Sequence, residues 1–221
     1  YELKNFDKSS SYAMRVLNVN PKNISAIQNM ANIRFCNAQY EEALAYYQQM
    51  YQINPNSYIA MINIANTYYC MGKYVLALEF AKKSIKKHPS SVTAHMIAGN
   101  ALAAMDKNEK ALQMYIQANE LDYTRVDTLN ALSNSYHSIG DWENCLLFSW
   151  RYLKLAPQNV NSYHLNFGYL LYECYSEKSI ELACKYAQKW LKRFPENKVA
   201  LHMGNAILNN QTIATSDTEY V

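Results

Sequence analysis

The sequence is poor in the residues that interrupt secondary structure, with 5 glycines and 5 prolines among 221 residues. This scarcity argues against a turn-rich all-β protein and against a disordered chain. No Gly-, Pro- or Ser-rich linker divides the sequence, although it is long for one ordinary core. Half of the residues are apolar and 20 are tyrosine. We therefore predict an all-α chain built as one elongated array.

The chain also lacks a strong net charge, a long apolar run and a signal-peptide pattern. A formal net charge of +3 is too small to indicate a nucleic-acid or anionic-membrane partner. No apolar run reaches the roughly 18 residues that a membrane-spanning helix needs. We expect a soluble, cytoplasmic protein without membrane insertion. Because the sequence begins at Tyr1 rather than Met, we interpret it as part of a longer or processed chain.

Cysteines in paired spacing are absent as well. The five cysteines are odd in number, form no CxxC motif and stand in apolar helical contexts, which favours reduced core residues in a reducing compartment. Neither they nor the five histidines show the clustered spacing of a zinc site. We predict neither a metal nor another cofactor. The cysteines are Cys36, Cys70, Cys145, Cys174 and Cys184.

Motifs of catalysis are missing too. The sequence has no nucleophile elbow, no Gly-rich phosphate loop and no pair of carboxylates in a setting that would separate their pKa values. A Ser, His and Asp assembled only by the fold stays open at this point. We expect no catalytic residues in this segment.

The sequence does contain a repeat with a step of 34 residues. Proline recurs at Pro21, Pro55, Pro89 and Pro157, with Tyr123 at the intervening place, and Pro195 follows after 38 residues. Within the unit from residue 58, apolar residues at three- and four-residue spacing predict two helices of about 14 residues around a turn at Gly72. A helix pair this short buries its apolar face only by stacking on its neighbours. Small residues keep the same step and allow close packing: Ala43, Ala77, Ala111, Cys145 and Ala183, and Ala31, Ala65, Gly99 and Ser133.

Three segments carry a family resemblance: AQYEEALAYYQQMYQINPN, DKNEKALQMYIQANELDY and GDWENCLLFSWRYLKLAPQ. They resemble the second half of the tetratricopeptide repeat, and the resemblance extends over nearly the whole chain. It implies an all-α, right-handed superhelix, an α-solenoid of stacked antiparallel helix pairs. The expected organisation is a partial repeat at 1–23, repeats at 24–57, 58–91, 92–125, 126–159 and 160–197, a capping or unpaired helix at 198–210, and a flexible tail at 211–221.

The fifth repeat departs from this pattern by four additional residues around 172–179. The insertion is predicted to lengthen the turn between the two helices, and its first helix is out of step by about one place. An irregular turn can serve a partner, but a tolerated loop is the preferred interpretation.

Asparagine also follows the 34-residue step, at Asn32, Asn66, Asn100 and Asn134. Helical spacing extends these four positions into a polar stripe along the first helix of each repeat. In the resembled family this stripe lines a concave wall that binds extended peptides, and an amide can both accept from and donate to a peptide backbone. The alternative is that the asparagines bond to neighbouring helices. The candidate peptide-binding residues are Gln28, Asn29, Asn32, Asn63, Asn66, Tyr69, Asn100, Asn130, Asn134, His137, Asn166, Tyr169 and Tyr172.

Members of the family that capture the acidic C-terminus of heat-shock chaperones use Lys and Arg on this stripe. The matching places from residue 24 lack those cations, and a carboxylate clamp needs charge-assisted bonds. A chaperone tail is therefore not the expected partner. The matching places hold Gln28, Asn32, Asn63, Thr93 and Ile97.

The leading hypothesis is an interaction module that binds an extended, largely uncharged protein or peptide partner. A rival is that the segment is the substrate-recognition or regulatory arm of a glycosyltransferase or methyltransferase whose catalytic domain lies outside it. The terminal SDTEYV resembles the link between some bacterial repeat arrays and a methyltransferase domain. A third hypothesis is self-association through 198–210.

Overall fold

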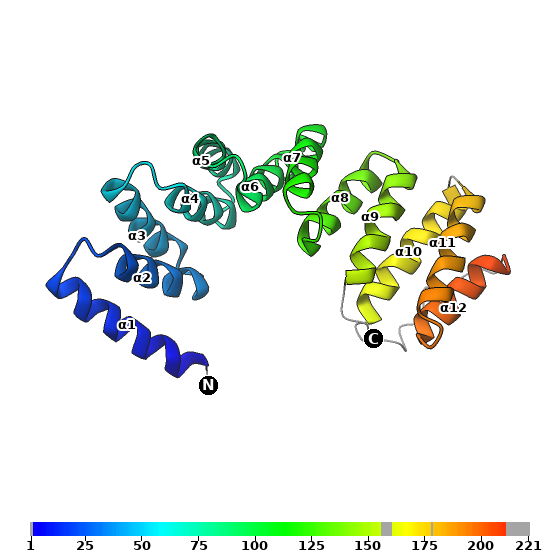
Figure 1. Cartoon of the computed structure of the whole chain (residues 1–221), viewed down its shortest axis with the longest axis horizontal. Coiled ribbons are helices and arrows are strands. Elements are labelled where there is room, and N and C mark those ends of the chain that lie inside the picture. Colours follow the sequence, from blue (N-terminus) through cyan, green and yellow to red (C-terminus); the bar gives the residue numbers. More distant parts are fainter. Residues whose placement is uncertain (1, 156–160, 178, 211–221) are drawn as a thin grey trace. The chain divides into compact units, whose positions relative to one another are not determined.

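A computed structural model describes residues 2–155, 161–177 and 179–210, which form twelve α-helices and no strand (Figure 1). The predicted all-α class is confirmed. Contacts divide the chain into two units, Tyr1–Asp122 and Tyr123–Val221, and each is described by itself. The first unit contains α1 (Glu2–Val19), α2 (Ile24–Cys36), α3 (Tyr40–Ile53), α4 (Tyr58–Cys70), α5 (Tyr74–Lys87), α6 (Val92–Ala103) and α7 (Asn108–Leu121). The second contains α8 (Val126–Ser138), α9 (Trp142–Leu155), α10 (Asn161–Glu177), α11 (Ile180–Arg193) and α12 (Lys198–Leu208).

Small residues stand where the helices of a pair meet. In the first unit α2 pairs with α3, α4 with α5 and α6 with α7, while α1 packs on α2. Ala31, Ala43, Ala65 and Ala77 are all completely buried. A methyl side chain at these crossings lets the two helix axes approach closely, which a larger side chain would prevent. The predicted series of small contact residues is thereby confirmed.

The first helix of each pair in this unit begins at a capping side chain. Asn23, Ser57 and Ser91 accept a hydrogen bond from the backbone N–H three residues later, at 3.0, 3.2 and 3.3 Å. Each bond satisfies one of the N–H groups that a helix start leaves without a partner. These caps follow the 34-residue step and fix where each repeat begins.

In four of the pairs, α2–α3, α4–α5, α6–α7 and α8–α9, the turn contains a residue with positive φ. This residue falls at Ala38, Gly72, Asp106 and Gly140, with φ of 57°, 73°, 57° and 73°. The left-handed conformation costs a residue with a Cβ about 1–2 kcal/mol, whereas glycine adopts it freely. Two of the four turns therefore carry a conformational penalty that the other two avoid.

Exchanging the residue types at these turns gives a matched test. Ala38→Gly is expected to raise the free energy of unfolding by about 0.5–1 kcal/mol, after allowance for the greater freedom of glycine in the unfolded chain. Gly72→Ala is expected to lower it by about 1 kcal/mol, since a Cβ there would meet no atom within 4 Å and the cost is purely conformational. Urea unfolding of the full chain measures both. If Gly72→Ala left the free energy of unfolding unchanged, the conformational penalty assigned to positive φ at this turn would be contradicted.

The second unit is built around aromatic residues of α10 and α11. Trp190 and Phe167 are completely or almost completely buried, and their rings meet edge to face at 5.3 Å. The indole N–H of Trp190 donates to Nδ1 of the buried His164 at 3.0 Å. Helix α12 packs on both α10 and α11 through a face that includes Val199 and Met203. The residues expected to cap the array thus form a helix with a buried face.

Two expectations are wrong. The four additional residues of the fifth repeat do not lengthen the turn: they lengthen the helix, since α10 has 17 residues where α8 has 13, and α11 begins at Ile180. Cys36 and Cys70 are exposed rather than part of the core, although all five cysteines are free thiols. Both end the first helix of a pair, beyond the last buried turn. The expected flexible tail at 211–221, with SDTEYV, and Pro157 lie outside the described residues.

Candidate functional site

In the first unit, two asparagines of the 34-residue series bond to a tyrosine of the second helix in the same pair. The hydroxyl of Tyr47 donates to Oδ1 of Asn32 at 2.7 Å, and that of Tyr115 donates to Oδ1 of Asn100 at 2.8 Å. Each tyrosine stands 15 residues after its asparagine and is almost completely buried. At these two places the amide has a structural partner, as the alternative interpretation of the asparagine stripe allowed.

The two tyrosines share an electrostatic consequence of this packing. Burial, with a smaller contribution from the Cys36 thiol, raises the pKa of Tyr47 to about 12. Burial, with a smaller contribution from Tyr69, raises the pKa of Tyr115 to about 12. Both hydroxyls therefore stay protonated and able to donate over the whole neutral range.

The other two members of the series have no tyrosine at the corresponding place. Fifteen residues after Asn66 stands Ala81, and fifteen after Asn134 stands Ser149. A methyl or hydroxymethyl group is too short to cover the amide as the tyrosine ring does. The repeats thus alternate between an asparagine that accepts a hydrogen bond from a tyrosine and one with no tyrosine at the corresponding place.

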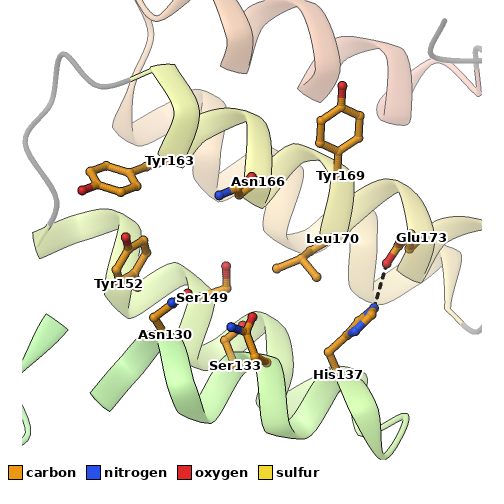
Figure 2. A pocket seen from close by; sticks show the side chains of 11 residues that line it. Asn130, Ser133, His137, Ser149, Tyr152, Tyr163, Asn166, Tyr169, Leu170 and Glu173 are labelled. Atoms are coloured by element: carbon orange, nitrogen blue, oxygen red, sulfur yellow. Dashed lines mark hydrogen bonds and ion pairs between the residues drawn. The ribbon is translucent and has the colours of Figure 1, made fainter. Parts of the chain in front are cut away.

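At Asn134 the uncovered place is part of a pocket of about 420 Å³ between α8, α9 and α10 of the second unit (Figure 2). This volume lies in the range of about 300–1,000 Å³ that is typical of ligand sites. Figure 2 shows that side chains from all three helices face the pocket. The lining residues are Asn130, Ser133, Asn134, His137, Ser149, Tyr152, Tyr163, Asn166, Tyr169, Leu170 and Glu173.

The two ends of the pocket differ in chemistry. At one end the rings of Tyr152 and Tyr163 meet edge to face at 5.1 Å, and burial together with the bond to Tyr163 raises the pKa of the Tyr152 hydroxyl. At the other end Nε2 of His137 lies 2.8 Å from Oε2 of Glu173, joining α8 to α10. The middle of the pocket is lined by amides and hydroxyls, which can both donate and accept hydrogen bonds.

The structure brings five of the predicted binding residues to this pocket: Asn130, Asn134, His137, Asn166 and Tyr169. All five are exposed, and in Figure 2 the Tyr169 ring is turned away from α8. Tyr172 does not line the pocket, because its half-buried ring packs against the core of the second unit.

The remaining predicted residues lie in the first unit, along α2, α4 and α6. Among them Asn29 and Asn32 are exposed and the others are half-buried. The ring of Tyr69 lies 5.6 Å from that of Tyr74. That these residues bind a partner stays a prediction. They are Gln28, Asn29, Asn32, Asn63, Asn66, Tyr69 and Asn100.

Sequence reasoning missed six lining residues, and for one of them the signal was present. Ser149 could have been found by following the 34-residue step back to Tyr115 and Tyr47, which reveals a loss of bulk beside Asn134. Glu173 lies within the inserted segment, whose helical course the repeat pattern did not predict. The others are Ser133, Tyr152, Tyr163 and Leu170.

A second hollow of about 430 Å³ lies in the first unit, where Lys22 faces Gln49, Gln52 and Ile53 of α3. The side-chain amide of Gln49 donates to the carbonyl of Pro21 at 3.3 Å, which ties the loop before α2 to α3. None of the candidate binding residues lines it. It therefore has weaker support as a functional site than the pocket beside Ser149.

Metal binding and membrane insertion are two further classes of function that the described residues can be compared with. Within that part of the chain, no group of three or more His, Cys, Asp and Glu side chains could hold a metal ion. No helix among 2–155, 161–177 and 179–210 has both the length and the apolar character to cross a membrane.

Comparison with known proteins agrees with the repeat. Residues 37–118 match the family model described as anaphase-promoting complex, cyclosome, subunit 3. No curated protein gives a significant match. Among solved structures, YrrB, described as a TPR protein with an unusual peptide-binding site, has a TM-score of 0.62 at 19% identity, covering 87% of this chain and 97% of that chain.

Two further structures are similar. The Cut9–Hcn1 hetero-tetramer of APC/C gives a TM-score of 0.67 at 14% identity, covering 93% of this chain and 40% of that chain. The first TPR of Spaghetti (RPAP3), bound to the HSP90 peptide SRMEEVD, gives 0.51 at 21% identity, covering 53% of this chain and 93% of that chain. The repeated helix pairs and these similarities show that the chain has the fold of stacked helix pairs seen in tetratricopeptide-repeat structures. At such identities the likeness to solved structures shows the fold alone.

The buried tyrosines predict an alkaline instability of the first unit. A tyrosine whose pKa rises from about 10 in the unfolded chain to about 12 in the fold contributes stability that is complete below about pH 10. That contribution is lost as the pH rises through 12. The double variant Tyr47→Phe/Tyr115→Phe is expected to be less stable at pH 7, by about 1 kcal/mol per lost hydrogen bond, but to lose less stability between pH 10 and 12. Urea midpoints across that range measure this.

Tyr12 provides the control for this experiment. It is 68% exposed on α1, so Tyr12→Phe should change neither the neutral stability nor its alkaline decline. An unchanged alkaline decline in the double variant would contradict the assigned role of burial.

Proposed function

We propose that the chain is a protein-interaction module and that an extended peptide segment binds in the pocket between α8, α9 and α10. The observation that carries this proposal is the exchange of tyrosine for serine at Ser149. In two repeats of the first unit a tyrosine hydroxyl hydrogen-bonds to the asparagine of the 34-residue series, whereas Ser149 provides no such partner and the exposed Asn134 lines a pocket of about 420 Å³. The peptide takes the place that the tyrosine ring occupies elsewhere.

The lining supports an extended peptide rather than a compact apolar ligand. Three asparagines, Asn130, Asn134 and Asn166, come from two helices and offer both a carbonyl oxygen and an NH2 group. Each can pair with the N–H and C=O of a peptide backbone without regard to its side chains. Because these amides are exposed in the free protein, water satisfies them, and binding exchanges one set of hydrogen bonds for another.

Similar structures are consistent with this function. YrrB is described as having a peptide-binding site, and the Spaghetti repeat is bound to the peptide SRMEEVD. That peptide is acidic, whereas the described residues that line the pocket of this chain include no Lys or Arg. We therefore do not propose that the pocket binds a peptide carboxylate through charge-assisted hydrogen bonds.

Restoring the tyrosine provides the most direct functional test. Ser149→Tyr should place a hydroxyl beside Asn134 in the arrangement that Tyr47 makes with Asn32, fill the pocket and abolish peptide binding. Stability should be unchanged or higher, because the ring and its hydrogen bond have precedents in the first unit. The measurement is selection of a random peptide library, displayed on phage, against the full chain.

The wild-type chain should enrich peptides, and Ser149→Tyr should not. Ser11→Tyr is the matched control, since Ser11 is exposed on α1, and it should enrich the same peptides as the wild type. If Ser149→Tyr folds and selects the same peptides, the pocket is not the binding site. If the wild-type chain selects none, the proposed function fails.

Dividing the asparagine series separates structure from binding. Asn32→Ala/Asn100→Ala should lower the melting temperature, since each change leaves the hydroxyl of a buried tyrosine without its acceptor, at about 1–3 kcal/mol per site. Asn66→Ala/Asn134→Ala should leave it nearly unchanged and weaken binding of a selected peptide. Calorimetry with that peptide measures both quantities. An equal loss of stability in the two double variants would show that the whole series is structural.

A further inference from the structure

The His137–Glu173 end of the pocket has a charge that the proposed function does not use. Glu173 is the one carboxylic acid among the described lining residues, which otherwise offer amides, hydroxyls, the imidazole of His137 and the apolar Leu170. Within the part of the chain that the structure describes, no lysine or arginine lines the pocket beside it. A cationic ligand group placed at this end therefore meets a carboxylate.

The carboxylate retains capacity to accept further hydrogen bonds. His137 approaches one oxygen, Oε2, at 2.8 Å, while a carboxylate has two oxygens and about four lone-pair directions. The pairing fixes the Glu173 side chain between α8 and α10, and Figure 2 shows both side chains converging at this end of the pocket. The exposed fraction of the Glu173 side chain is 48%, so a ligand can reach it.

Ser133 connects this part of the pocket to the buried core. Ser133 lines the pocket, and its hydroxyl lies 3.7 Å from Sγ of the completely buried Cys145 and donates to the Cys145 carbonyl. The pKa of the Cys145 thiol is raised to about 11, chiefly by burial, with the Glu173 and Asp141 carboxylates among the further causes.

From this geometry we propose that the pocket selects a basic side chain, arginine or lysine, in the bound peptide, and that its cationic head lies against Glu173. This inference rests on the proposed function and specifies its ligand. Leu170 and the His137 ring line the same pocket and offer apolar contact to the aliphatic part of such a side chain, while the Glu173 carboxylate accepts from its donors. An acidic side chain at the same place would be repelled by Glu173 and would find no cation among the lining residues.

The wild-type chain and Glu173→Gln are to be compared in the same phage-displayed peptide selection. Glutamine keeps an acceptor for His137 and removes the charge. Peptides selected by the wild type should share arginine or lysine at one position, and Glu173→Gln should lose that preference while retaining the others. Glu196→Gln is the matched control, because Glu196 is an exposed carboxylate in the same unit that lies outside the pocket.

Synthetic peptides then measure the effect. A selected peptide, acetylated so that its terminal amine carries no charge, is compared with versions bearing Ala or Glu at the basic position. For the wild type, the Ala peptide should bind about fivefold more weakly, as for a half-exposed ion pair, and the Glu peptide more weakly still. For Glu173→Gln the basic and Ala peptides should bind equally.

The outcomes separate the two proposals. A selection that yields peptides without a basic position, or a basic preference that survives Glu173→Gln, overturns this inference and leaves the peptide-binding function standing. A selection in which the wild type enriches no peptide overturns both. Comparison of the arginine and lysine versions shows whether the planar guanidinium or the compact ammonium is preferred.

Discussion

Close contact between helices through residues with little or no side chain is the constraint on which the structure depends. Each helix pair has too little apolar surface to be stable alone, so it must pack on its neighbours. Completely buried alanines at 34-residue steps make that packing possible, and the capping residues and positive-φ turns repeat with the same step. This packing leaves one face of the first helix in each pair for polar residues. Because the residues around that face differ between repeats, its binding properties can differ as well.

The asparagine series shows that the same residue has different surroundings in different repeats. The same residue at the same place is held by a tyrosine in two repeats of the first unit and is exposed beside a pocket at Asn134. The asparagine therefore does not determine the role; the residue 15 positions later does. Where serine stands in place of tyrosine, Asn134 has no tyrosine hydroxyl to accept from, whereas the buried Tyr47 and Tyr115 keep their hydroxyls protonated and bonded.

Much of the fold could be predicted from the sequence because each repeat is specified by residues that are close together in the chain. The 34-residue step, the small contact residues and the turn glycine at Gly72 predicted the helix pairs. The course of residues 172–177 could not be predicted, because an insertion can extend either a turn or a helix, and only packing decides between them. Five predicted residues line the pocket, but the sequence did not reveal that Asn32 and Asn100 accept hydrogen bonds from tyrosines, since contact between helices depends on side-chain direction as well as spacing. Glu173 was not predicted to line the pocket, because it lies in the inserted segment whose helical course the sequence did not reveal.

The central claim is that Asn134 is the member of the series that a peptide reaches in the second unit, because Ser149 leaves it uncovered. Nuclear magnetic resonance of the side-chain NH2 groups tests this claim directly, with a peptide from the selection titrated into the full chain. We expect large chemical-shift changes for the side-chain amides of Asn130, Asn134 and Asn166. The chemical shift of Asn32 should change little, because its side-chain oxygen already accepts a hydrogen bond from Tyr47. Shifts confined to Asn32 and Asn100, with Asn134 unchanged, would contradict it.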